Sequence, residues 1–153
     1  MEKKKLAIGT LLDKMQRYCA YQERCIYDVR KKLSAYDVSQ RDEEWRIDML
    51  IDDKFIDEER FTRCYVRSKV ASYWGIIRIE NELKLRKIPR DITERAIGEI
   101  NEEDYRERFE KLADEKIKST GGIDSLKQKA RVYNYLASRG YESSMIMDFL
   151  SVK

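Results

Sequence analysis

The sequence predicts an all-α protein in which three tandem three-helix repeats form an elongated, curved arrangement. Three observations lead to this prediction: a composition suited to solvated helices, charge blocks that alternate in sign, and an apolar pattern that occurs three times. The chain has 153 residues, of which 42% are hydrophobic and 40% charged, and it contains one proline. The length fits one domain or a few small repeats, and the composition supplies both a core and long solvated helices.

Positive and negative charge alternate in blocks along the chain. Residues 1–35 carry a net charge of +5, residues 61–90 carry +6 and residues 118–153 carry +3, whereas 36–60 carry −6 and 91–117 carry −5. Charged residues are expected on any solvated helix, whether or not the chain contains repeats. Three basic blocks separated by two acidic ones nevertheless indicate repeated units with distinct faces.

Each repeat is marked by a leucine late in a basic, helix-like stretch, with a further apolar residue five positions later. The leucines are Leu33, Leu83 and Leu136, and their spacings of 50 and 53 residues are typical of tandem helical repeats. The residues five positions later are Val38, Ile88 and Tyr141. More apolar residues follow in equivalent register, which we assign as Trp45, Met49 and Leu50, then Ile92, Ala96 and Ile97, then Met145, Phe149 and Leu150.

Another helix precedes the leucine of each repeat. Its apolar residues lie at positions i, i+3 and i+4, as in Met15/Tyr18/Cys19, Phe61/Cys64/Tyr65 and Phe109/Leu112/Ala113. Each repeat therefore contains three short helices. After a basic N-terminal stub at 1–10, we place the repeats at 11–54, 55–103 and 104–153.

Glycine, proline and short polar residues mark the expected helix ends. Gly75 opens the middle helix of the second repeat, and Pro89 lies just after Ile88, where that helix should have ended. Asp91 and Ser143 are the expected N-caps of the third helices in the second and third repeats.

The residue inventory argues against an enzyme. The chain has no histidine, which removes Ser-His-Asp and Cys-His catalysis and His-containing zinc sites, and it has no glycine-rich phosphate-binding loop. Its three cysteines, Cys19, Cys25 and Cys64, are expected to be free thiols that fill the core. We expect no catalytic residue, no metal and no cofactor.

The apolar runs bear on localisation. They extend over only a few residues, far below the roughly 18 needed to cross a bilayer. The N-terminus has a basic stub but no sustained apolar stretch or cleavage site of a secretory signal. We therefore expect a cytoplasmic protein without a membrane partner.

Four stretches carry a resemblance to a known family. Residues 55–69 contain an acidic turn, then Arg-Phe, then Tyr-Val-x-Ser, and residues 75–83 contain Gly-x-x-x-Ile-x-x-Glu-Leu. Residues 26–33 have two basic residues before leucine, and residues 138–141 form an Arg-Gly-Tyr turn. Together these stretches resemble the RecX family, regulators of the RecA recombinase, and the resemblance covers nearly all of residues 11–150.

The resemblance implies a monomeric, non-enzymatic modulator that lies in the helical groove of the RecA filament on single-stranded DNA. Such a protein limits filament growth and dampens strand exchange and ATP hydrolysis, in homologous recombination, DNA repair and the SOS response. The alternating charge blocks are compatible with this, because a filament groove presents acidic and basic protein surface close to phosphate.

Candidate contact residues are the basic side chains of the middle helices and their surroundings. Those predicted to bind phosphate or acidic protein surface are Arg30, Lys31, Arg78, Lys84, Arg86, Lys87, Arg90, Lys127, Lys129, Arg131 and Arg139. Asp57, Glu58 and Glu59 are candidates for a basic partner surface, although most acidic clusters are expected to complement helix N-termini. Tyr73 and Trp74 present either a stacking platform for bases or, as we favour, packed aromatic residues.

Two other functions stay open from the residues alone. A helical-repeat adaptor would bind a protein other than RecA and ignore DNA. A carboxylate-dependent nuclease is disfavoured, because no acidic pair has a basic or metal-orienting partner at a recognisable spacing.

Overall fold

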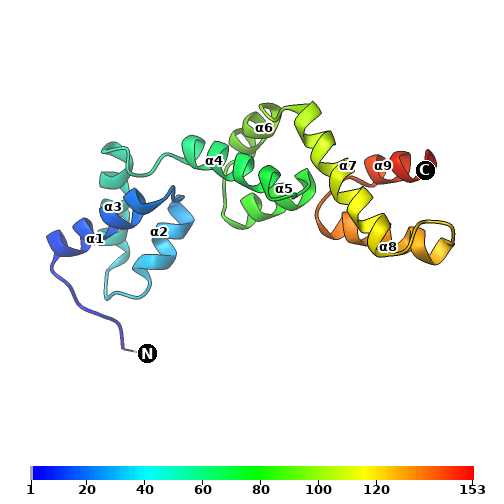
Figure 1. Cartoon of the computed structure of the whole chain (residues 1–153). Coiled ribbons are helices and arrows are strands. Elements are labelled where there is room, and N and C mark those ends of the chain that lie inside the picture. Colours follow the sequence, from blue (N-terminus) through cyan, green and yellow to red (C-terminus); the bar gives the residue numbers. More distant parts are fainter. Residues whose placement is uncertain (1) are drawn as a thin grey trace.

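The computed structural model describes residues 2–153, apart from the side chain of Ile8. Within these residues the chain forms nine α-helices and no β-strand, which confirms the all-α prediction. None of these helices combines the length and the apolar character needed to span a bilayer. In chain order (Figure 1) they are α1 (Ile8–Tyr21), α2 (Ile26–Leu33), α3 (Gln40–Asp52), α4 (Glu58–Ala71), α5 (Ile76–Leu85), α6 (Arg90–Gly98), α7 (Glu102–Ser119), α8 (Leu126–Ser138) and α9 (Ser143–Ser151).

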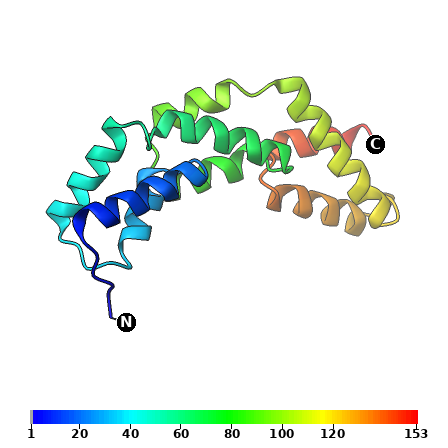
Figure 2. The ribbon, with the colours of Figure 1, turned by 60° about the vertical axis from the view of Figure 1, so that its left-hand side comes forward.

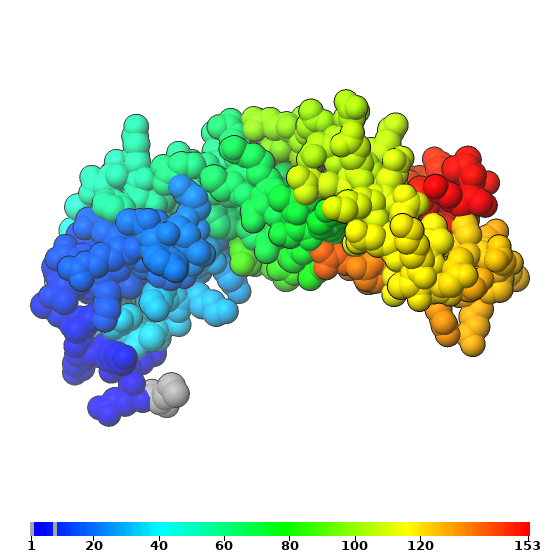
Figure 3. Space-filling model, viewed as in Figure 1, coloured from blue at the N-terminus to red at the C-terminus, as the bar shows by residue number. Residues whose placement is uncertain are grey.

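The helices follow one another along an extended arc (Figures 1 and 2). We call α1–α3 unit 1, α4–α6 unit 2 and α7–α9 unit 3, because the most closely packed helices belong to the same unit. The accessible surface is 10130 Å², whereas a compact protein of this mass exposes about 8,200 Å². The space-filling view shows the same curved outline (Figure 3). The predicted elongated, curved arrangement is confirmed. The predicted repeat boundaries, 11–54, 55–103 and 104–153, remain predictions.

Polar side chains begin four of the helices by accepting a hydrogen bond from a backbone N–H in the first turn. Ser39 accepts from the N–H of Asp42 at 3.2 Å, Asp57 from that of Arg60 at 3.0 Å, Asn101 from that of Asp104 at 2.9 Å and Ser125 from that of Gln128 at 3.1 Å. Acidic residues fill the first turns of α3, α4 and α7. Most of the acidic clusters therefore lie at helix N-termini, as expected, where they favour the helix dipole.

The residues before α1 lie against unit 1. Lys4 forms an isolated β-bridge with Tyr36. The Lys4 N–H donates to the Ala35 carbonyl at 3.1 Å, and the Lys4 carbonyl accepts from the Asp37 N–H at 2.8 Å. These bonds attach the basic N-terminal segment to the turn that follows α2.

The three leucines Leu33, Leu83 and Leu136 are all buried, which confirms them as equivalent core positions. The core itself is divided unequally. Unit 1 packs around its own cluster, which includes Leu11, Met15 and Leu50, whereas units 2 and 3 share one continuous cluster. Cys25, at the start of α2, belongs to the second cluster. Unit 1 is thus the most independent part of the molecule.

The predicted apolar register is wrong at two places. Trp45 is 46% exposed, and α3 instead buries Arg46, Ile47 and Leu50. Cys64 is exposed, and α4 buries Val66 and Val70 as well as Phe61. The prediction that all three cysteines fill the core therefore holds only for Cys19 and Cys25. Successive side chains of an α-helix point about 100° apart around its axis. A shift of one residue in the assigned register therefore moves a side chain off the buried stripe.

Two predicted N-caps are also wrong by one or two residues. Pro89, rather than Asp91, is the N-cap of α6, and Glu142, rather than Ser143, is the N-cap of α9. Pro89 has an extended ψ of 139°, and its carbonyl accepts the first hydrogen bond of α6, from the Thr93 N–H at 3.2 Å. A proline is well suited here, because the residue that opens a helix needs its carbonyl but not its N–H. Gly75 is the N-cap of α5, as predicted.

Unit 3 joins unit 2 through a direct backbone contact between Gly75 and Gly140. The N–H of Gly75 donates to the Arg139 carbonyl at 2.8 Å, and the N–H of Ile77 donates to the Gly140 carbonyl at 3.0 Å. A Cβ atom on Gly75 would lie 2.1 Å from the Gly140 carbonyl carbon, and one on Gly140 would lie 2.3 Å from the Arg78 Cβ. Gly140 also has a φ of +96°, which disfavours any side chain. Both positions therefore require glycine.

We predict that G140A destabilises the protein by roughly 2–4 kcal/mol, because it combines a left-handed backbone with a clash against backbone atoms. Thermal denaturation followed by circular dichroism measures this. The matched control is G98A in α6, where an added Cβ has nothing within 4 Å. That variant should be neutral or slightly more stable. Equal melting temperatures for G140A and wild type would contradict the role of this contact.

Candidate nucleic-acid and partner interface

The structure divides the predicted basic residues into two groups. Three of them, Arg78, Arg86 and Arg139, are half-buried. The exposed ones are Arg30, Lys31, Lys84, Lys87, Arg90, Lys127, Lys129 and Arg131. Only the second group consists of exposed side chains.

The densest exposed group lies in unit 2, where α5 turns into α6. Lys84 and Arg90 line the same hollow of about 390 Å³ between these helices, and Lys87 lies in the connecting turn with a φ of +58°. Arg90 pairs with Glu94 at 2.8 Å, but its side chain is 92% exposed, so this bond contributes little. Within residues 2–153, Lys84 and Lys87 form no salt bridge. Their charges are available to an external anion.

Units 1 and 3 contribute weaker groups. Arg30 and Lys31 lie on α2, and Arg30 Nη1 is 3.4 Å from Glu43 Oε2. In unit 3, Lys127 and Arg131 are one turn apart on α8, whereas Lys129 points about 200° away from Lys127 around the helix. The structure therefore does not bring the three α8 residues onto one face.

Arg86, one of the predicted contact residues, is half-buried between units 1 and 2. Its Nε atom is buried and lies 3.9 Å from Asp28 Oδ1 of unit 1, and its guanidinium lies 5.3 Å from the centre of the Tyr65 ring. Arg60 in α4 makes a second link, because its Nε donates to Glu23 Oε1 at 2.6 Å. Charged side chains thus connect unit 1 with unit 2. Sequence reasoning missed Glu23, Asp28 and Arg60, since no local pattern pairs residues so far apart in the chain.

Arg139 and Arg78 also have partners within the protein. Arg139 Nε donates to the Tyr73 carbonyl at 3.0 Å, and its Nη2 donates to the Ser72 carbonyl at 2.5 Å. These bonds cap the C-terminal end of α4 from unit 3. The guanidinium of Arg78 lies 3.7 Å from the centre of the Trp74 ring, which also packs against the core. Trp74 is therefore a packed aromatic residue, as we favoured.

The acidic stretch 57–59 mainly serves the fold. Asp57 caps α4, and Glu59 pairs with Arg95 of α6. Burial raises the pKa of Glu58 to about 7, and the negative charge of Asp28 adds to the effect. Glu58 Oε2 is buried and has no hydrogen-bond partner among residues 2–153. The acidic turn of the family resemblance thus lies near Asp28, at the junction between units 1 and 2.

We predict a pH-dependent stability that originates at Glu58. The pKa of this carboxyl is higher in the folded protein than the roughly 4.3 of the unfolded chain. The stability that this protonation contributes is therefore fully present below about pH 4 and is lost as the pH rises through 7. E58Q, which cannot ionise, should be more stable than wild type at pH 8, by about 1–2 kcal/mol after allowance for partial exposure.

Urea denaturation between pH 5 and pH 8 tests this prediction. The difference between E58Q and wild type should shrink toward pH 5, where Glu58 is protonated. The control E59Q removes a neighbouring exposed carboxylate. A difference that stays constant over the whole range would contradict a titration of Glu58.

Two family models match this chain, and both describe parts of RecX. The second three-helix domain of RecX matches residues 57–97, and the third three-helix domain matches residues 102–150. Together the two matches cover more than half of the chain. They contain the helices of units 2 and 3 almost completely.

Curated relatives and solved structures agree with these matches. "Regulatory protein RecX" of Vibrio campbellii is 29% identical over 82% of this chain and 79% of the relative. The protein of the same name from Salmonella paratyphi B is 29% identical over 88% of this chain and 86% of the relative. That of Lactobacillus gasseri is 21% identical over 84% of this chain, which spans only 48% of that relative.

The fold is similar to that of crystallised proteins of the same name. The crystal structure of RecX from Lactobacillus salivarius aligns with a TM-score of 0.80 at 22% identity and covers 94% of each chain. A further crystal structure of regulatory protein RecX also gives a TM-score of 0.80, at 23% identity, over 92% of this chain and 71% of the other. With two domain models in chain order and the same fold, the chain belongs to the RecX family of regulatory, non-enzymatic proteins.

Proposed function

We propose that this protein binds in the groove of a filament that RecA forms on single-stranded DNA, and that it limits filament growth, strand exchange and ATP hydrolysis. The observation that carries the proposal is the extended three-unit arc with exposed Lys84 and Lys87 in its central unit. Membership of the RecX family supports RecA as the partner.

The arc is suited to contact with several subunits of a helical assembly at once. Its surface exceeds that of a compact protein of equal mass, and its charge alternates in sign along its length. Linked weak contacts act as one strong contact, because the second binding event is intramolecular. An arc bound across neighbouring subunits opposes the rearrangements that filament growth and strand exchange require.

Lys84, Lys87 and Arg90 are the residues that we place closest to DNA phosphate. They lie at the centre of the arc, and neither lysine is neutralised by a salt bridge within residues 2–153. We do not assign Arg86, Arg78 and Arg139 to this role, since each one is half-buried and has a partner inside the protein. Phosphate contacts position a protein on nucleic acid without reading its sequence. This suits a protein that binds filaments formed on DNA of any sequence.

We predict that K84E/K87E raises the concentration needed to inhibit the ATPase of RecA on single-stranded DNA by at least about tenfold. Its folding stability should change by no more than about 0.5 kcal/mol, because both side chains are exposed. The control K111E/K118E reverses the same charge at two exposed positions of α7. Equal inhibition by K84E/K87E and wild type would place the interface elsewhere.

We also predict that binding to the filament weakens steeply with salt. Each phosphate contact releases counterions, so log affinity falls as log salt rises. In K84A/K87A this negative slope should become shallower by about two. Co-sedimentation with assembled filaments at several salt concentrations measures the slope. An adaptor that ignores DNA would bind with a slope that these substitutions leave unchanged.

A further inference from the structure

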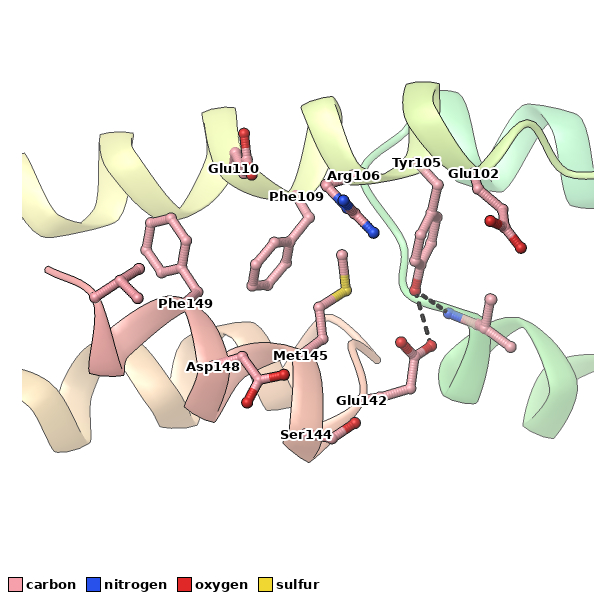
Figure 4. A pocket seen from close by; sticks show the side chains of 12 residues that line it. Glu102, Tyr105, Arg106, Phe109, Glu110, Glu142, Ser144, Met145, Asp148 and Phe149 are labelled. Atoms are coloured by element: carbon pink, nitrogen blue, oxygen red, sulfur yellow. Dashed lines mark hydrogen bonds between the residues drawn. The ribbon is translucent and has the colours of Figure 1, made fainter.

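A groove of about 670 Å³ separates α7 from α9 in unit 3 (Figure 4). Its floor is apolar: the largely buried rings of Tyr105 and Phe109 from α7 and of Phe149 from α9, together with the half-buried Met145 of α9, lie between the two helices. The lining positions extend over about two turns of each helix, or roughly 12 Å. This volume lies in the range of pockets that bind ligands or side chains of partners.

Carboxylates surround this floor. Glu102 and Glu110 come from α7, Asp148 comes from α9, and Glu142 is the N-cap residue of α9. Within residues 2–153 none of the four forms a salt bridge, and the Glu142 carboxylate accepts a hydrogen bond from the Tyr105 hydroxyl at 3.0 Å. Arg106 is the one basic residue of the lining, so the groove has a net charge of −3.

We propose that this groove binds a basic, amphipathic helical segment of a partner protein. Apolar side chains one turn apart on such a helix fit the floor, and flanking lysines or arginines fit the uncompensated carboxylates. Nucleic acid does not fit, because its phosphates have the same sign of charge as the rim. The inference goes beyond the proposed DNA contact: unit 2 meets phosphate, and unit 3 meets protein.

The test uses the full chain and a synthetic helical peptide with leucines at i, i+4 and i+7 and lysines on both flanks. Fluorescence anisotropy should show binding that weakens as salt rises. A peptide with glutamate for each lysine, and one with serine for each leucine, should each bind at least tenfold more weakly.

Two charge-reversal variants locate the site. E102K/E110K, on the groove side of α7, should reduce the affinity for the lysine peptide at least tenfold. E103K/E107K reverses two exposed carboxylates of the same helix that do not line the groove, and should leave most of the affinity. Circular dichroism verifies that both variants are folded.

Three results would overturn the proposal. The first is that the lysine peptide fails to bind at millimolar concentration. The second is that both variants lose affinity equally. The third is that a single-stranded oligonucleotide competes with the peptide for the groove and that E102K/E110K abolishes this competition. None of these results bears on the phosphate contacts of Lys84 and Lys87, whose test is the ATPase of the filament.

Discussion

The close approach of two backbones at Gly75 and Gly140 determines how unit 3 sits on unit 2. No side chain fits between them, and the neighbouring N–H and carbonyl groups use the contact to complete their hydrogen bonds. Arg139 and Tyr141, on either side of Gly140, then reach the end of α4 and the shared core. Units 2 and 3 thereby form one continuous body, and the direction of the outer half of the arc follows from this contact.

The other junction has a different physical character. Unit 1 keeps its own core and meets unit 2 through Cys25, which packs into the shared core of units 2 and 3, and through ion pairs, with Arg60 bound to Glu23 and Arg86 close to Asp28. Partly exposed ion pairs contribute little to folding stability, and their strength changes with salt and pH. Buried apolar contacts carry no charge that salt could screen. Glu58, whose carboxyl is protonated more readily than usual, lies at this junction. The position of unit 1 is therefore the part of the fold most sensitive to solution conditions.

This organisation separates structural charge from charge that can bind a partner. Arginines that lie between units have partners in the protein, whereas Lys84 near the end of α5 and Lys87 in the following turn form no salt bridge within residues 2–153. The acidic groove of unit 3 adds a surface of opposite sign at one end of the arc. A molecule with such distinct surfaces can meet phosphate and protein at different points along its length.

The sequence alone determined the helical class, the threefold repetition and the buried leucines Leu33, Leu83 and Leu136, because periodicity and spacing are local properties of the chain. It also placed the starts of α5, α6 and α9 to within two residues. Only the tertiary structure decided that Arg86 lies beside Asp28 and Arg139 bonds the end of α4, that Trp45 and Cys64 face solvent, and that α7 and α9 enclose a groove. The physical reason is that burial, pairing and the pKa of Glu58 depend on residues brought together from distant parts of the chain, and helical spacing contains no information about which units meet.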